Sequence, residues 1–407
     1  VSSFCQGSLS CTPPPEMAAR DGEGFPSDGS KGAHRFLLQG RQCTWDEYWR
    51  LCREEHPGDG SASIIAGAYL RTLDVNHEAF TVDTEHTTTA VTLITPGLFA
   101  DLRVPCKSSV RFAGRRALAE CTDSELRELA RTVSFCGFHV VRHDVPGYEG
   151  SPVCERLTCI DSQPPPRRFP NQWRIQTNWD RGGWIEWGAR KDASGQALYV
   201  EHWRRLPAGE AKPFLALRRS AKEGRDGFLL VVGDHFLFLD DRACGPLPAV
   251  VLGRDGHTDR GQLQALAGKA TSTDELRNLV SYCSAHGRVG DGWRVALSSW
   301  PWLEGEHLLG QGARLNGARV SADGTAVRMR EADPDAAVEG CAQASAPLER
   351  EWEVLESSHS VESLRVLLGC APSSASHAPT KRKLAPDEAD DPPQVDGAAA
   401  VVSKRKK

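Results

Sequence analysis

The feature that most constrains the fold of this chain is an internal repeat. The segment Glu125–Leu129 (ELREL) recurs 150 residues later as Glu275–Leu279 (ELRNL). Three further features recur in the same order around it. An apolar run ends in Asp-x-Arg at Asp101–Arg103 and again at Asp240–Arg242. A Ser-aromatic-Cys triplet stands at Ser134–Cys136 and Ser281–Cys283, and a late segment built on tryptophan at Glu201–Leu206 and Arg350–Leu355. A period this long exceeds that of a solenoid or propeller unit, so it predicts duplication of a whole domain of about 150 residues.

Both repeats contain short segments in which buried-type and polar residues alternate, which is typical of β-strands. In Leu98–Val104 the even-numbered residues, all apolar, share one face, while Phe99, Asp101 and Arg103 share the other. Further segments of this kind are Ala90–Ile94, Trp173–Trp179, Trp184–Trp187, Tyr199–Trp203, Phe228–Val232, Phe236–Leu239, Trp293–Leu297 and Trp352–Leu355. The Gly233–His235 triplet between two of them fits either a tight hairpin or a bulged long strand.

A strand-rich unit of this size forms a closed barrel most economically, because closure removes exposed sheet edges. We therefore expect a mainly β fold of two tandem antiparallel β-barrels, with few short helices and disordered tails. The expected divisions are a disordered segment at 1–33, a first barrel domain with a preceding helix at 34–209, a second barrel domain at 210–370 and a disordered basic and acidic tail at 371–407. The 407 residues are 40% hydrophobic, enough chain to bury the cores of two such domains.

Capping residues mark the expected helices. Thr44, Thr122 and Ser272 each stand three residues before a glutamate, the pattern of a capping box. The helix at 44–55 would have an aromatic face, so we expect it to plug or flank the first barrel. Ser360 would cap a last helix with four residues on its apolar side: Val361, Leu364, Leu367 and Leu368.

The C-terminal tail carries two basic clusters: Lys381, Arg382 and Lys383, and Lys404, Arg405, Lys406 and Lys407. They predict either a nuclear-import signal or a solvated charge run that only aids solubility. The chain has 13 scattered cysteines and no C-x-x-C pair, which argues against a zinc ribbon and a secreted disulfide framework. We expect a reducing compartment: the cytoplasm, and the nucleus as well if the tail is used.

Other signals exclude broad classes. The net charge of −5 argues against a general nucleic-acid binder, and no apolar run approaches the length of a membrane span. The chain has no P-loop, no G-x-S-x-G, no dinucleotide fingerprint and no H-E-x-x-H, so no cofactor is expected. His139, His143, His202 and His235 could meet in space, but they lack carboxylate or cysteine at ligand spacing, and we expect no metal.

Three segments resemble a known family: Leu98–Pro105, Tyr199–Arg204 and Gly233–Phe236. They are similar to segments of two-barrel, lipocalin-like (calycin-like) proteins of bacteria and fungi, which are largely uncharacterised and are similar in layout to a casein-kinase-interacting protein of yeast. The resemblance covers residues 85–357. It implies paired lipocalin-like barrels and no established catalytic residues.

Two Asp-x-Arg motifs place an acid and a base two residues apart on one strand face, Asp101 with Arg103 and Asp240 with Arg242. Both are expected to be structural ion pairs, since duplicated architecture is more common than duplicated chemistry. The alternative is that Arg103 recognises an anionic ligand.

Tryptophans crowd the late strands of the first repeat. Large rings fill a small barrel, yet the alternation also suits a ligand cup with apolar walls and few polar groups. The candidate ligand-binding residues are Arg103, Trp173, Trp179, Trp184, Glu201 and Trp203. A second cluster, Trp293 and Trp300–Trp302, would contact a protein partner if exposed and form the seam between barrels if buried.

We expect a non-enzymatic binding protein that holds a small apolar ligand or docks a protein partner, without nucleic-acid or membrane partners. The alternative is an enzyme that uses acid–base residues inside the first barrel, such as Asp101, Glu201, His139 or His202. An enzyme needs titratable groups that converge in one pocket, whereas a binding barrel needs aromatics and satisfied pairs. The sequence favours the second pattern.

Overall fold

The computed structural model describes residues 35–38, 41–44, 50, 64–76, 81–82, 88–106, 112, 114–143, 145, 151–163, 171–179, 182–188, 199–220, 225–242, 262–311, 313–332 and 348–370. Most of these residues form two large antiparallel sheets, which belong to one compact unit spanning residues 1–370. A small hairpin of β1 (Arg35–Leu38) and β2 (Arg41–Thr44) precedes them.

The first sheet closes into a barrel. It contains β3 (Gly67–Asn76), β4 (Thr81–Val82), β5 (Thr88–Ile94), β6 (Leu98–Pro105), β7 (Val133–Arg142), β8 (Val153–Asp161), β9 (Asn171–Trp179), β10 (Gly183–Gly188) and β11 (Tyr199–Arg205). From β5 to β11 each strand pairs with the next one in the chain, β3 pairs with β4 and β5, and β11 also pairs with β3, which completes the ring.

The second sheet has the same strand order but remains open. It contains β12 (Phe214–Arg219), β13 (Gly227–Val232), β14 (His235–Asp240), β15 (Cys283–Arg288), β16 (Arg294–Ser298), β17 (Leu315–Val320), β18 (Ala326–Glu331) and β19 (Leu348–Ser357). Strand β19 pairs with β12, but β16 and β17 lie at opposite edges and do not pair. The expected fold class, mainly β with two tandem antiparallel barrels, is confirmed, and the second barrel is an open one.

Equivalent backbone details support duplication. In each repeat a serine amide donates to a serine hydroxyl at 2.8 Å, from Ser134 to Ser162 and from Ser284 to Ser299. Each repeat also has a bulge at a glycine on the adjoining strand pair, Gly137 or Gly287. The donor serines and the bulge glycines are each 150 residues apart, the same offset that the helical segments show. The acceptor serines do not keep this offset.

This register corrects two alignments. Ser134 corresponds to Ser284, so the triplet at Ser281–Cys283 is not its equivalent. Phe99 and Phe236 lie opposite the two bulge glycines, and four residues further on Arg103 therefore corresponds to Asp240. The two Asp-x-Arg motifs are therefore two residues out of register and are not equivalent.

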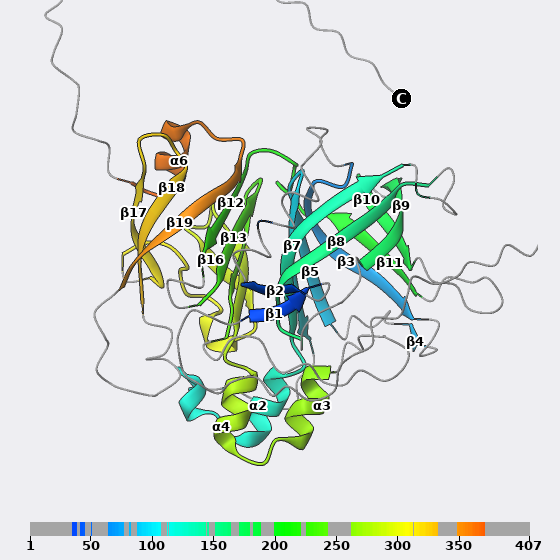
Figure 1. Ribbon diagram of the computed structural model, residues 1–407, viewed down its shortest axis with the longest axis vertical. Coiled ribbons are helices and arrows are strands. Elements are labelled where there is room, and N and C mark those ends of the chain that lie inside the picture. The colour runs from blue at the N-terminus through cyan, green and yellow to red at the C-terminus, as the bar shows by residue number, and fades with distance from the viewer. Residues whose placement is uncertain are drawn as a thin grey trace, which may run out of the picture. The chain divides into compact units, whose positions relative to one another are not determined.

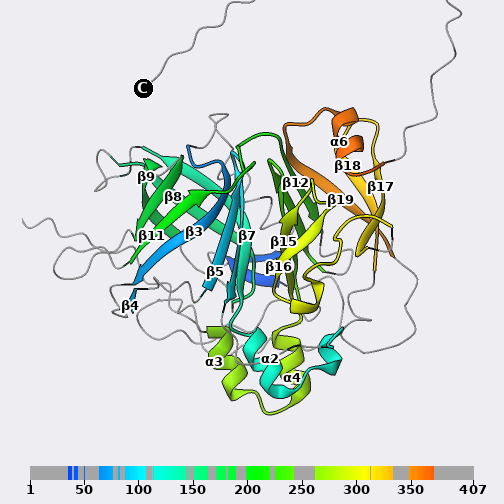
Figure 2. The same cartoon turned by 180° about the vertical axis from the view of Figure 1, so that it is seen from behind.

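The alternation in β6 separates two cores. Leu98, Ala100 and Leu102 face outward and pack against the outer face of the second sheet, while Phe99 faces the interior of the first barrel. The cluster between the sheets, here called the seam, also contains Phe228, Leu230 and other residues of β12–β14. Seen from behind, β5 and β7 lie beside β12 and β15 (Figure 2).

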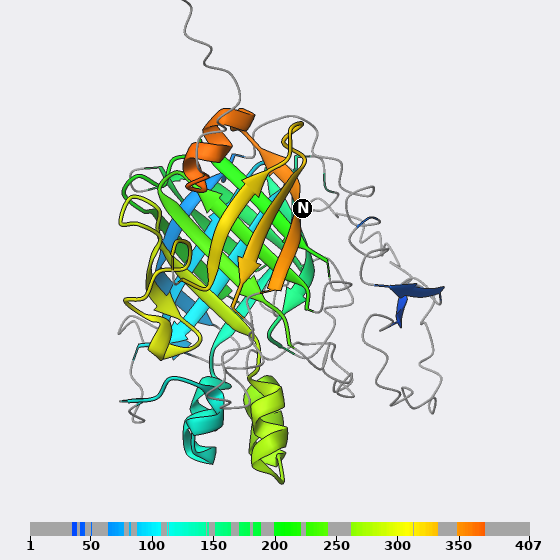
Figure 3. The ribbon, with the colours of Figure 1, turned by 90° about the vertical axis from the view of Figure 1, so that its left-hand side faces the viewer.

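Short helices lie at both ends of the sheets. Near one end are α2 (Asp123–Leu129), α3 (Gln262–Lys269) and α4 (Thr273–Leu279), and at the other end is α6 (Val361–Leu367) (Figures 1 and 3). Two single turns of 3-10 helix are η1 (Leu118–Glu120) and η3 (Pro301–Leu303).

The predicted caps at Thr122, Ser272 and Ser360 are confirmed, since each side chain accepts a hydrogen bond from the amide three residues on. Thr122 forms a complete capping box with Glu125, whose carboxylate accepts from the Thr122 amide. The sequence did not reveal α3.

The structure also settles the turn at Gly233. Strands β13 and β14 form a hairpin with Val232 opposite His235, and Gly233 has a φ of +58°. A left-handed φ is the reason a glycine stands there. Of the predicted helix at 44–55, Thr44 is the last residue of β2 and only Arg50 is described as helical, while the aromatic residues lie outside the described part. Residues 1–33 and the basic clusters of 371–407 also lie outside it.

Among the described residues, no helix has both the length and the apolar character needed to cross a membrane.

Candidate binding sites

The interior of the first barrel holds a buried network of charges centred on Arg103. Its guanidinium contacts Asp101 through Nε at 2.8 Å and Glu201 through Nη1 at 2.9 Å. Arg71 donates to the same Glu201 oxygen, also at 2.9 Å, and contacts Asp74 at 2.8 Å. Burial alone would lower the pKa of Arg103, but the two carboxylates beside it raise that pKa well above its ordinary value.

A further carboxylic acid, Glu186, lies in this network. Burial, the Glu201 charge and a hydrogen bond with Glu201 raise the pKa of Glu186 well above its ordinary value. Arg156 and Arg103 oppose that rise. Because a buried carboxylate beside another carboxylate is disfavoured, this environment favours the protonated form of Glu186.

Aromatic rings enclose the charges. The Arg156 guanidinium lies between the rings of Phe99 and Trp173, 4.2 and 4.6 Å from their centroids. Its Nη1 lies 3.7 Å from Asp101. Trp184 and Trp203 are directly opposite one another on β10 and β11, and their rings stack at 5.4 Å. The wall of this interior is therefore aromatic, and its centre is ionic.

The structure brings five of the six candidate ligand-binding residues together here: Arg103, Trp173, Trp184, Glu201 and Trp203. The sixth, Trp179, ends β9, and its side chain lies outside the described part. All five are buried, and their surroundings are more polar than those of an apolar cup.

The histidines do not join the carboxylates. His139 Nε2 lies 3.2 Å from the Pro96 carbonyl in the β5–β6 turn, at the end of the barrel away from Arg103. His202 alternates with Glu201 and Trp203 along β11, so its side chain points away from the interior. His235 lies in the second sheet, where its ring stacks on His286. Within the described ranges, no group of three side chains could hold a metal.

The second barrel contains a smaller ionic cluster around Asp240. Arg219 and Arg314 both contact this carboxylate, the latter at 2.6 Å. Arg219 also contacts Glu331, whose other oxygen accepts the Trp352 indole N–H at 2.8 Å. Burial would raise the pKa of Asp240, yet the arginines lower it below its ordinary value.

The predicted ion pair between Asp240 and Arg242 is not formed. Arg242 donates instead to three backbone carbonyls, those of Leu279, Asp161 and Ser162. The last two belong to the first repeat, so Arg242 links the repeats. Because Asp240 corresponds to Arg103 and faces the barrel interior, its partners come from other strands of that interior. Asp101 and Arg103 do form an ion pair, and it is buried.

The second tryptophan cluster divides between two places. Trp300 is buried in the core of the second barrel and donates its indole N–H to the Val280 carbonyl at 3.3 Å, and Trp302 stacks on it at 5.7 Å. The seam is built from other residues. Trp293, just before β16, has a left-handed φ of +64° and lines a pocket.

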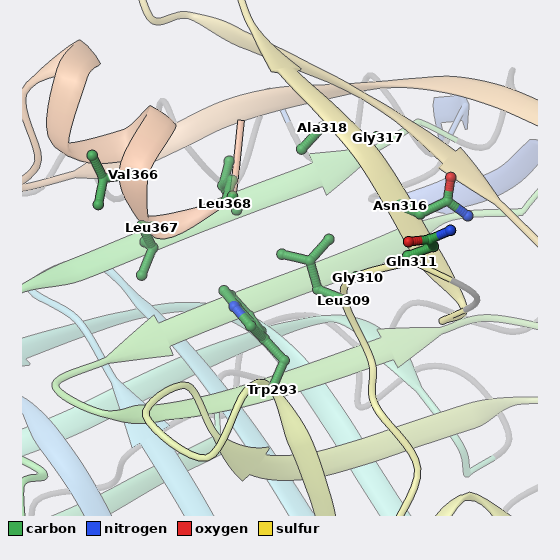
Figure 4. Close-up of a pocket in the computed structure, with 11 residues that line it drawn as sticks. Trp293, Leu309, Gly310, Gln311, Asn316, Gly317, Ala318, Val366, Leu367 and Leu368 are labelled. Atoms are coloured by element: carbon green, nitrogen blue, oxygen red, sulfur yellow. The ribbon is translucent and has the colours of Figure 1, made fainter. Parts of the chain in front are cut away.

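That pocket, of about 350 Å³, lies beside β17 and α6 (Figure 4). It adjoins the segment that links β16 and β17 in place of direct pairing, in which His307 pairs with Arg294 and Leu309 with Leu315. Its walls come from the start of β16, the loop before β17, β17 itself and α6: Trp293, Leu309, Gly310, Gln311, Asn316, Gly317, Ala318, Val366, Leu367, Leu368 and Gly369. We call it the α6 pocket.

The α6 pocket has an apolar end and a polar end. Val366, Leu367 and Leu368 lie at one end, and the amide side chains of Gln311 and Asn316 lie at the other (Figure 4). Trp293 and Leu309 lie between them (Figure 4). Val366 is 73% exposed, so the pocket opens to solvent on that side. An elongated molecule with an apolar body and one polar group fits this arrangement.

Sequence reasoning identified the apolar side of the last helix but not the pocket. The usable signal was the helix itself: Leu364 and Leu368 bury in the second core, while Val366 and Leu367 are left at its border. The opposing wall comes from β17, a strand that the alternation did not reveal.

No protein-family model matches the chain, and no curated protein matches it. Among solved structures it is similar to YLR301w, an uncharacterised protein of Saccharomyces cerevisiae, with 12% sequence identity. The match covers 73% of this chain and 100% of that one, with a TM-score of 0.37.

Proposed function

We propose that this chain is a non-enzymatic binding protein of two calycin-like barrels and that it holds a small, mainly apolar ligand in the α6 pocket. The observation that carries this proposal is the missing pairing between β16 and β17. In the first barrel the corresponding strands, β8 and β9, pair directly. In the second, His307 and Leu309 bridge from Arg294 to Leu315 in place of direct pairing. A pocket of about 350 Å³ with apolar and polar walls lies beside this segment, a size in the range of small-molecule sites.

The chemistry of the walls supports a ligand with a polar group at one end. Leucine, valine and tryptophan side chains would contact its body, and transfer of apolar surface from water is the main source of affinity in such sites. The amides of Gln311 and Asn316 each offer both a donor and an acceptor. They suit a hydroxyl, an amide or a carboxyl group.

The state of the candidate acid–base residues supports binding over catalysis. Asp101 and Glu201 are fully buried and held in ion pairs, and His139 bonds the backbone at the other end of the barrel. A general base must reach the proton that it abstracts. Asp101 and Glu201 are instead held by arginines inside a closed sheet.

The test is titration of the full chain with N-phenyl-1-naphthylamine, a neutral apolar dye that fluoresces in apolar sites. We expect saturable binding of one dye, with energy transfer from Trp293. Ala318→Phe should fill the pocket and Val366→Asp should charge its mouth, and each should weaken binding by about tenfold or more. Val366 is so exposed that its replacement should leave the fold intact.

The matched control is Leu348→Ser. Leu348 is an apolar residue of the same sheet, 42% exposed and outside the pocket, so its loss should leave dye affinity unchanged. Equal affinity in all variants, or no saturable binding, would refute the proposal. If the dye fails but a peptide with an apolar side chain binds and is lost in Val366→Asp, the pocket docks a protein partner instead.

A further inference from the structure

A second site, independent of the α6 pocket, is indicated by buried donors inside the first barrel. The indole N–H groups of Trp173, Trp184 and Trp203 are enclosed, and the described residues offer them no hydrogen-bond acceptor. The same is true of Nε and Nη2 of Arg156, which is 4% exposed, and of Nε of Arg205. Buried polar groups normally find partners, and each exception needs an explanation.

The second barrel shows that this shortage is not a property of the fold. Trp352 occupies on β19 the place that Trp203 occupies on β11. Trp203 lies opposite Arg71, and the Trp352 ring lies 5.3 Å from the guanidinium of the equivalent arginine, Arg219. The Trp352 N–H bonds Glu331 at 2.8 Å. In the first barrel Asp101 and Glu201 are bound to arginines and Glu186 bonds Glu201, and the indoles have no acceptor among the described residues.

Charge is also unbalanced in the first barrel. Four arginines contact its interior: Arg71, Arg103, Arg156 and Arg205. Arg205 belongs to the group because its Nη2 donates to Tyr69 at 3.1 Å, and the Tyr69 ring lies 5.9 Å from Trp184. Among the described residues, three carboxylates form ion pairs with these arginines: Asp74, Asp101 and Glu201. The environment of the fourth acid, Glu186, favours its protonated form, so the described arginines outnumber the paired carboxylates by one.

We propose that the interior of the first barrel binds a small monovalent anion, which accepts hydrogen bonds from Arg156 and from the indole N–H groups around it. An anion supplies acceptors without bringing donors, and it balances the unmatched charge. Water would do neither, because each molecule adds two donors to an interior already rich in them. The enclosure of the donor atoms restricts the anion to a few atoms, such as a halide, nitrate or acetate.

The planar guanidinium of Arg156 is the best-placed group. It is held between two aromatic rings, and its contact with Asp101 uses only Nη1. Two N–H groups on one edge therefore stay available for a bidentate contact, the geometry in which arginine binds anions. The sequence alternative of an anion held by Arg103 is less suited, because Arg103 already contacts both Asp101 and Glu201.

The experiment follows the indole N–H resonances of the full, ¹⁵N-labelled chain by NMR. The protein starts in sodium gluconate, whose anion is too large for the site, and is titrated with chloride, nitrate and acetate. We expect the resonances of Trp173, Trp184 and Trp203 to shift saturably with at least one of them. The resonances of Trp352 and Trp300 are internal controls and should not move, since their N–H groups have protein acceptors.

Arg156→Gln should weaken the anion affinity by about tenfold or more, since it removes a charge-assisted contact. The matched control is Arg328→Gln, at an exposed arginine of β18. If Arg156→Gln does not fold, Trp173→Phe keeps the ring, removes one donor and should still weaken binding. No saturable shift with any of the three anions, equal shifts at all five indoles, or unchanged affinity in these variants would overturn the proposal.

Discussion

The two barrels share a backbone plan and differ in what their interiors contain. The first sheet is closed, and its interior combines charged groups with tryptophans whose N–H groups have no acceptor among the described residues. The second is open between β16 and β17, and its smaller ionic cluster gives the Trp352 N–H a partner. The closed sheet encloses the larger set of charged side chains, whose partners must lie inside the same barrel. The open sheet has the smaller ionic cluster, and a pocket lies beside its edge strand β17.

Equivalent positions show how the difference arose. At the position of Arg103 in the first barrel the second has Asp240, and each is held by side chains of opposite sign. Arg71 and Arg219, in contrast, are the same residue in both. The backbone landmarks, a serine pair and a bulged glycine, also stay the same. Since the duplication, the residues that set the strand pairing have stayed the same, while several side chains that line the interior have changed.

The largest expected effect comes from a change in the ionic cluster of the second barrel. Asp240→Asn leaves two arginines around a neutral amide in a fully buried place. We expect the free energy of unfolding to fall by about 3–5 kcal/mol, as when one partner of a buried ion pair is removed. Urea unfolding of the full chain measures it.

The control for that change is Glu351→Gln, which removes an exposed ion pair with Arg328. Such pairs contribute about 0–1 kcal/mol, so the midpoint should hardly move. Similar losses in the two variants would show that the Asp240 cluster is not the support that its burial indicates.

The next effect concerns what the barrels share. A Cβ added at Gly137 would lie 2.0 Å from the Leu157 carbonyl oxygen, and one at Gly287 would lie 1.9 Å from the Arg294 carbonyl oxygen. Backbone on the facing strand must move in both cases. We expect Gly137→Ala and Gly287→Ala to destabilise the chain by similar amounts, about 1–3 kcal/mol.

Gly268→Ala is the control, since a Cβ at this residue of α3 meets no atom within 4 Å, and helices favour alanine over glycine. Its unfolding midpoint should stay or rise. A loss at only one of the two bulge glycines would mean that the bulges are not equivalent, and it would weaken the case for duplication.

Much of this fold could be predicted from the sequence. The alternation in 98–104 gave both the strand and its two faces, and the Thr122 box gave the start of α2. The alignment of the repeats was wrong in detail. Ser281 was matched to Ser134, whereas the equivalent of Ser134 is Ser284, which the structure identifies by its hydrogen bond to Ser299. Such a bond joins residues that short motifs do not connect.

The sites were harder to predict. Tryptophan alternation correctly brought Trp173, Trp184 and Trp203 together. Most of the charged residues around them come from three other strands, β3, β6 and β8, and only the pairing registers show that these strands converge. The α6 pocket could not be predicted at all, because it exists only where β16 and β17 do not meet.

The smallest effect at any one pH, and the sharpest contrast between the interiors, comes from their acids. The folded-state pKa of Glu186 is raised above its ordinary value of 4.5, chiefly by burial, and that of Asp240 is lowered below 3.8 by its arginines. Below pH 4.5 Glu186 is protonated in both the folded and the unfolded chain. As the pH rises, the unfolded chain releases this proton while the folded chain retains it, so Glu186 makes the free energy of unfolding fall with pH until its folded-state pKa is reached. Asp240 acts in the opposite direction, since its contribution is lost only as the pH falls.

Glu186→Gln mimics the protonated acid and removes this one titration. We expect the variant and the parent chain to have similar stability at pH 4, and the variant to gain relative to the parent towards pH 7, in urea unfolding at several pH values. Asp241, whose buried carboxyl has a pKa of about 6, titrates in both proteins and cancels in the difference. Parallel curves for the two proteins would mean that Glu186 is ionised in the folded chain. The charge balance of the first barrel would then be neutral, and its case for binding an anion would rest on the unpartnered donors alone.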